Sequence, residues 1–268
     1  MSSKMKIGCL GFIVLLAIGL AASISPIPQD TTYHIFANKE MWWGIPNAEN
    51  VLSNIVFVVA GVAGLIKIGH RAKTEVTPMW KFFFGAVILV ALGSAYYHWL
   101  PTNDTLVWDR LPMTLCFAAL MACICAERLG VKIGRLLFLP LVVSGVLSVF
   151  YWWFSENYGF GDLRPYILIQ FLPMILIPVI LVLFPKTPDQ NKPYWLLLAS
   201  YIIAKGFELN DDLIFNLTNH VISGHSLKHL SVAVGIMTLR ANSPQEVSDA
   251  GESVETFSKG SLTENGIL

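Results

Sequence analysis

Eight long apolar segments constrain the fold of this chain more than any other feature of its sequence. A helix that crosses a lipid bilayer needs about 20 mostly apolar residues. The segments that meet or approach this length are residues 7–26, 50–66, 82–100, 111–126, 136–155, 165–185, 193–207 and 221–239. Charged residues make up only 13% of the 268 residues, against about 25% in soluble domains. The sequence therefore predicts an all-α membrane protein, a seven-transmembrane helical bundle with one extra N-terminal hydrophobic segment.

The N-terminal segment has two interpretations. Lys4 and Lys6 precede it and small residues end it, which is typical of a signal peptide as well as of an uncleaved helix. We assign residues 1–28 to this segment and residues 29–240 to the seven-helix membrane domain. Residues 241–268 are rich in Ser, Glu, Gly and Asn, and so polar a stretch cannot bury enough apolar surface to order itself. We expect them to form a disordered cytoplasmic tail.

Lysine and arginine are unevenly divided between the two ends of the predicted helices. One side holds Lys4, Lys6, Lys67, Arg71, Lys73, Lys81, Arg128, Lys132, Arg135, Lys186, Lys192 and Arg240, and the other holds Lys39, Arg110, Arg164, Lys205 and Lys228. The richer side is expected to be cytoplasmic. In a bacterium this would be an inner-membrane protein, and in a eukaryote a protein of the ER or Golgi. The formal net charge is zero, so nothing indicates a nucleic-acid partner, and no feature identifies a protein partner.

Four polar residues fall at the outer ends of apolar segments. His225 and His229 are spaced i, i+4 and therefore share one helical face at the start of the last segment. His98 closes the third segment, and Asp109 precedes the fourth, where we expect it at the positive N-terminal end of its helix. The predicted topology gathers these four residues at one membrane depth. Ser94 lies one turn before His98 on the same face.

Three histidines suit a catalytic zinc, which takes three protein ligands and keeps one position open for water. A nearby carboxylate such as Asp109 can accept a proton from that water and later give it to a leaving amine. Simpler interpretations exist for each residue. A histidine at a helix end can be an interfacial hydrogen-bonding group, Asp109 can form an ion pair with Arg110, and Ser94 can allow two helices to approach closely. Lys205 and Lys228 should face the bundle interior or an interface, because charge is costly in lipid.

These residues resemble the pattern of the alkaline ceramidases, in the wider superfamily that includes the adiponectin-type receptors. Family members have S-x-x-x-H in one helix, an Asp eleven residues later and H-x-x-x-H in the last helix, as in Ser94 with His98, Asp109, and His225 with His229. Residues 50–54 match the family's N-x-x-S-N, and residues 210–215 match its polar turn before the last helix. The resemblance spans about residues 33–240.

The resemblance implies a zinc site formed by His98, His225 and His229, with Ser94 and Asp109 as polar catalytic partners. It implies hydrolysis of a ceramide-like membrane lipid into a sphingoid base and a fatty acid. Two alternatives stay open: a lipid esterase, and a zinc-containing lipid receptor or sensor with negligible turnover. Animal members of the family also bind calcium through an acidic stretch that ends at the position of Asn47. Glu40 and Glu49 are out of register with that stretch, so the sequence does not support a calcium site.

Overall fold

The computed structural model describes residues 1–70 and 72–239 of the chain. The tail that we expected to be disordered, residues 241–268, lies outside the described residues. The elements are α1 (Ser3–Ser23), η1 (Thr31–His34), α2 (Ala48–Leu52), α3 (Ile55–Gly69), α4 (Thr77–Trp99), α5 (Asn103–Arg128), α6 (Val131–Asn157), α7 (Arg164–Leu183), α8 (Pro188–Leu209), α9 (Asp211–Leu217) and α10 (Gly224–Thr238). The regular structure of the described residues is helical, which confirms the predicted all-α fold.

Six stretches are long and apolar enough to cross a membrane: α1, the combined stretch Ala48–Gly69, α4, α5, α6 and α7. The chain is therefore a multi-pass membrane protein, as predicted. α10 has only 15 residues, and α8 includes charged residues at both ends, so neither meets the same criterion. That α8 and α10 also span the membrane, which gives seven helices after α1, remains a prediction.

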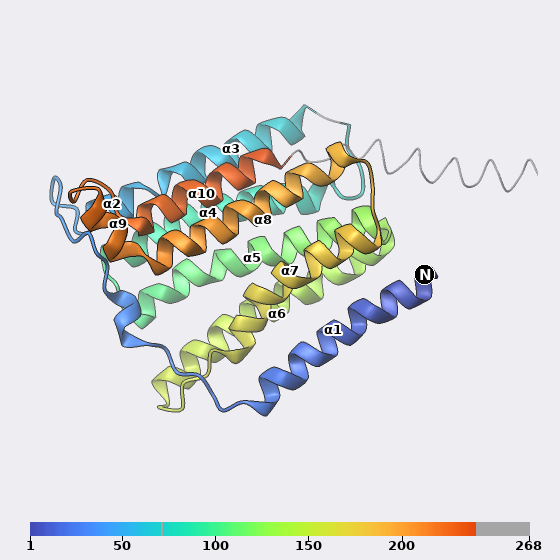
Figure 1. Ribbon diagram of the computed structural model, residues 1–268, viewed down its shortest axis with the longest axis horizontal. Helices are drawn as coiled ribbons and strands as arrows, with labels where there is room; N and C mark the ends of the chain where they lie inside the picture. Colours follow the sequence, from blue (N-terminus) through green and yellow to red (C-terminus); the bar gives the residue numbers. More distant parts are fainter. Residues whose placement is uncertain (71, 240–268) are drawn as a thin grey trace, which may run out of the picture.

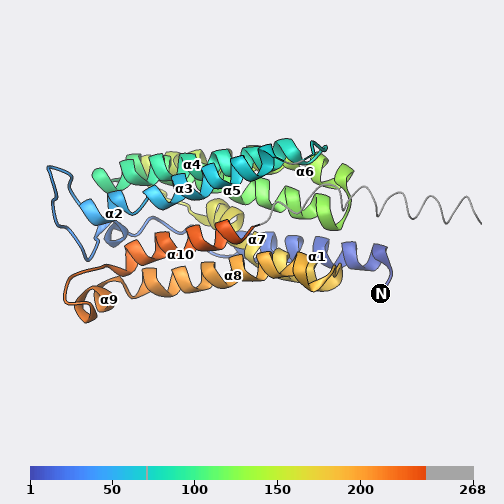
Figure 2. The ribbon, with the colours of Figure 1, turned by 90° about the horizontal axis from the view of Figure 1, so that it is seen from above.

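The long helices lie side by side in a bundle (Figures 1 and 2). Each of α3, α4, α5 and α6 packs against the next one along the chain, and α10 packs between α3 and α8. α1 lies at the edge of the bundle and packs against α7. The short helices α2 and α9 gather at one end of the bundle, next to the start of α10. The site described below is built at this end.

The structure corrects the predicted start of the fourth segment. α5 begins at Asn103, whereas the apolar segment predicted from the sequence begins at residue 111. Thr102 and Thr105 form a reciprocal cap, in which the Thr102 side chain accepts from the Thr105 amide at 3.2 Å and the Thr105 side chain accepts from the Thr102 amide at 3.0 Å. Asp109 therefore lies in the second turn of α5. The helix dipole acts within the first turn, so the expectation that Asp109 sits at the positive end of its helix is wrong.

The first core segment is interrupted at Ser53 and Asn54, between α2 and α3. Both side chains bond to the carbonyl of Asn50, from Ser53 Oγ at 3.0 Å and from Asn54 Nδ2 at 2.8 Å. Such local bonds compete with the regular helical pattern and commonly bend a helix. The interruption lets Ser53 reach the last helix, α10.

Candidate metal centre

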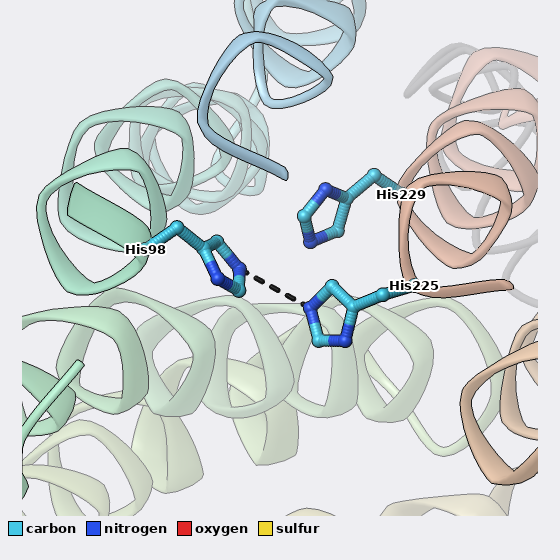
Figure 3. A group of neighbouring side chains, drawn as sticks. All are labelled: His98, His225 and His229. Atoms are coloured by element: carbon cyan, nitrogen blue, oxygen red, sulfur yellow. Dashed lines mark hydrogen bonds between the residues drawn. The ribbon is translucent and has the colours of Figure 1, made fainter. Parts of the chain in front are cut away.

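Three histidine rings point toward one another between α4 and α10 (Figure 3). His98 comes from the last turn of α4, and His225 and His229 come from the first two turns of α10. One possible ligand atom from each ring can be chosen so that all three lie within 4.8 Å of one another. The Nε2 atoms of His98 and His225 are 3.2 Å apart. All three side chains are buried, with 1%, 7% and 2% of their surface exposed.

The start of α10 is fixed by acceptors from two other short helices. Ser223 caps the helix by accepting from the Ser226 amide at 3.1 Å, and its own amide donates to Glu49 Oε1 at 2.9 Å. The His225 amide donates to Asp211 Oδ1, from α9, at 2.7 Å. Because amides at a helix start have no partner within the helix, these carboxylates both satisfy the amides and place His225.

The histidine side chains have their own positioning contacts. Ser53 Oγ lies 2.7 Å from His229 Nδ1, which leaves Nε2 as the nitrogen free to bind a ligand. Asn47 Nδ2 donates to the backbone carbonyl of His98 at 2.9 Å. Phe36 packs edge-on against His98 and His225, with ring centroids 4.7 and 5.0 Å away. The cluster is therefore oriented by hydrogen bonds and packed against an aromatic ring.

The donor set fits a metal ion. Ligand nitrogens in a tetrahedral zinc site with bonds of about 2.0–2.1 Å lie roughly 3.3 Å apart, close to the 3.2 Å between His98 and His225. The Nδ1 atom of His98 is buried without a hydrogen-bond partner among the described residues. Three buried imidazoles that converge in this way could hold a metal ion.

The other two candidate residues, Ser94 and Asp109, lie beside this cluster. The Ser94 side chain interacts with the Asp109 carboxylate, and both residues line the same cavity as His229. Within residues 1–70 and 72–239, Asp109 and Arg110 form no ion pair with each other or with any other residue. The simpler interpretation of Asp109 as the ion-pair partner of Arg110 is therefore wrong.

The cavity has a volume of about 420 Å³ and is lined by both apolar and polar residues. Most of its wall is apolar, and includes Val87, Val90, Met113, Leu120, Met174 and Ile236. Among its polar residues are Lys205 and Lys228, which both bind Glu208; Lys228 Nζ donates to Glu208 Oε1 at 2.9 Å. The two lysines thus face the interior, as predicted for charged residues in membrane helices.

Sequence reasoning identified the three histidines but missed the residues that place them. Ser53 was recognised only as part of the Asn50–Asn54 motif, with no role assigned to it. Asp211 was recognised only as part of a polar turn, and Phe36 was given no role. The only sequence signal for these residues is that polar side chains lie at the boundaries of apolar segments. Their contacts with α10 depend on the interruption at Ser53 and on the short helix α9.

Comparison with known proteins gives one match. The model of the protein family described as Ceramidase matches residues 44–242. No curated protein and no solved structure matches the chain.

Proposed function

Since this chain belongs to the ceramidase family, and is therefore a hydrolase of the ceramide amide bond, we propose that it uses a zinc ion held by His98, His225 and His229. The observation that carries the proposal is the buried cluster of three histidines, one of which, His229, lines an apolar cavity. Three neutral imidazoles are a set of ligands that suits zinc. When bound, zinc lowers the pKa of a water ligand to about 7 and polarises a carbonyl oxygen.

Asp109 is the proton carrier in this proposal. It lines the cavity without an ion-pair partner among the described residues, so its carboxylate is available to accept the proton of the attacking water. It then returns that proton to the nitrogen of the leaving sphingoid base. Three histidines already complete the protein ligands of a catalytic zinc, so Asp109 is not a fourth ligand.

Ser94 orients Asp109 and faces the reacting carbonyl. Its side chain interacts with the Asp109 carboxylate and lines the same cavity, and it stands one turn before His98 on α4. A hydroxyl at this place can turn to donate to the oxygen that becomes negative when the amide is attacked.

The cavity supports a lipid amide as the substrate. Its apolar wall accommodates an acyl or sphingoid chain, and its polar residues, including His229, Ser94 and Asp109, accommodate the amide. We propose that the lipid enters sideways between helices from the membrane. The catalytic groups on the cavity wall favour an enzyme over a lipid receptor with negligible turnover. An ester remains chemically possible, because the same activated water attacks esters.

We further propose that the site faces the non-cytoplasmic side of the membrane. The sequence assigns twelve lysines and arginines to the helix ends opposite the site and five to the helix ends at the site, and basic residues mark cytoplasmic loops. A single cysteine placed at Asn103 should react with an impermeant thiol reagent from outside, whereas one placed at Lys73 should not. The reverse labelling would contradict the orientation.

The activity is tested by comparing wild type with His225→Ala in detergent micelles that contain a ceramide and its ester analogue with the same chains. We expect wild type to release fatty acid from the amide, and His225→Ala to release none above the rate without enzyme. Release from the ester alone would make the protein an esterase. Tight ceramide binding without release from either lipid would favour the receptor.

A further inference from the structure

Arg110 is a buried cation without an ion pair. The residue is 5% exposed, and none of the ion pairs formed within residues 1–70 and 72–239 includes it. Its Nη2 donates to Gln29 Oε1 at 2.6 Å, while Nη1 has no partner there. A buried cation that lacks an anion destabilises the fold, so a buried Arg110 indicates a functional role that offsets this cost.

Three aromatic rings hold the guanidinium of Arg110 in place. Its Cζ lies 4.1 Å from the ring centre of Trp152, 4.6 Å from that of Tyr166 and 5.7 Å from that of Tyr33. The faces of such rings attract a cation but accept no strong hydrogen bond, so they offset part of the cost of burial. They leave the unpartnered Nη1 donor fixed in orientation.

Arg110 lines the same cavity as three carboxylates, those of Asp30, Asp109 and Glu208. Glu208 binds Lys205 and Lys228, Asp30 accepts from the Thr32 amide at 2.8 Å, and Asp109 is the proposed proton carrier. None of them forms an ion pair with Arg110. A ligand that brings its own negative oxygen into the cavity would therefore find an oriented cationic donor.

We propose that Arg110 binds an oxyanion in the polar head of the substrate, so that the protein prefers amide lipids with a phosphate or carboxylate head over neutral ones. The inference rests on the proposed function, since it names the substrate class of that site. Gln29 and Tyr33, which hold Arg110, precede the region matched by the family, residues 44–242. The segment after α1 thus adds a specificity determinant to the matched domain. In this proposal Arg110 determines which substrate binds, and Asp109 transfers the proton.

The test compares a ceramide with the 1-phosphate ester of the same ceramide, which share both chains and the amide and differ only in the phosphate of the head group. The variants are Arg110→Gln and Arg110→Lys, with Arg164→Gln as the control. Arg164 lies at the same end of the bundle as Arg110. It forms an ion pair with Asp162 at 2.8 Å and does not line the cavity. The measured quantity is the ratio of kcat/KM for the phosphate lipid to kcat/KM for the neutral lipid.

We expect wild type to favour the phosphate lipid, and Arg110→Gln to lower the ratio by about 10- to 100-fold, the usual worth of a hydrogen bond to a charged group. Arg110→Lys keeps the charge but loses the planar fork, so its ratio should fall between those of wild type and Arg110→Gln. Arg164→Gln should keep the wild-type ratio. Equal losses for both lipids in Arg110→Gln would overturn the inference, because they would show a purely structural role.

Two further arms separate the alternatives. Binding of both lipids to His225→Ala protein, with and without Arg110→Gln, measures the preference without turnover. If wild type hydrolyses neither lipid but the binding preference depends on Arg110, the proposed function fails and this inference stands. The second arm is inhibition by free laurate. Loss of that inhibition in Arg110→Gln, with an unchanged lipid ratio, would place the released fatty acid at Arg110 and overturn the head-group assignment.

Discussion

α1 and α5 are both long and apolar enough to span a membrane, yet they occupy opposite places in the bundle. In the most apolar 18-residue stretch of each helix, 6% of the residues of α1 are buried and 67% of those of α5. α1 is the more apolar of the two. Of the two, the helix better suited to lipid is thus at the edge, and the helix that carries Asp109 and Arg110 is buried among its neighbours.

The difference in burial between α1 and α5 arises because the bilayer itself is an apolar solvent. Lipid tails are as apolar as leucine, so apolarity alone gives a helix no reason to leave the lipid for the bundle. Helices pack where small residues allow close approach and where polar groups need partners. Polar residues inside an apolar segment therefore indicate the site better than the segment's apolarity does. Changes near α4, α5 and α10 should therefore have large effects on activity and stability, and equivalent changes in α1 small ones.

The largest effect is expected from removing two of the three histidines. His225→Ala with His229→Ala should lose bound zinc and lower ceramide hydrolysis by at least about 10⁴-fold, a modest part of a typical enzymatic rate enhancement. Zinc analysis and a fatty-acid release assay measure the two losses. His70→Ala, at the exposed C-terminal end of α3, is the control and should change neither. Undiminished zinc in the double variant would refute the assigned ligands.

A smaller loss is expected from Asp109→Asn, which keeps the shape of the side chain and removes its basicity. We expect retained zinc, with hydrolysis lowered by about 10²–10⁴-fold, the usual contribution of general acid–base catalysis. Zinc content and kcat, measured on one preparation, separate the two properties. Loss of the metal would make Asp109 a ligand or a ligand-positioning residue. A wild-type rate would contradict the proposed role in proton transfer.

Ser53→Ala should act on the metal more weakly, through His229. Removing the hydroxyl that lies 2.7 Å from His229 Nδ1 frees the ring to rotate, and the loss of such a contact usually costs about 10- to 100-fold in metal affinity or activity. Competition with a fluorescent zinc chelator measures the affinity. Ser23→Ala is the matched control, because Ser23 ends α1 and bonds only to the Leu20 carbonyl among the described residues. A similar loss in both variants would remove the distinction between the two regions.

The smallest effect concerns helix packing. A Cβ atom added at Gly93 would lie 1.9 Å from the Trp108 carbonyl oxygen, whereas one added at Gly8 in α1 would meet nothing within 4 Å. Gly93→Ala should therefore force α4 and α5 apart and destabilise the fold by about 1–3 kcal/mol, as overpacking usually does. Thermal unfolding in detergent should show a lower Tm for Gly93→Ala and an unchanged Tm for Gly8→Ala.

Sequence patterns predicted the helical class and the convergence of His98, His225 and His229, because the i, i+4 spacing and the alternation of helices are local properties. They did not predict where α5 begins, since the capped polar turn at Thr102 precedes the apolar run. They also did not predict the contact between Ser53 and His229, which joins residues 176 positions apart. That contact depends on the interrupted helix, and no property of either segment alone specifies it.

Zinc-edge X-ray absorption of the purified active protein can show whether His98, His225 and His229 hold one zinc ion. We predict one zinc per chain, with imidazole nitrogens at about 2.0–2.1 Å and an additional oxygen from water. The spectrum should be lost in the His225→Ala, His229→Ala double variant. A sulfur ligand, or a zinc spectrum that persists unchanged in that double variant, would contradict the claim.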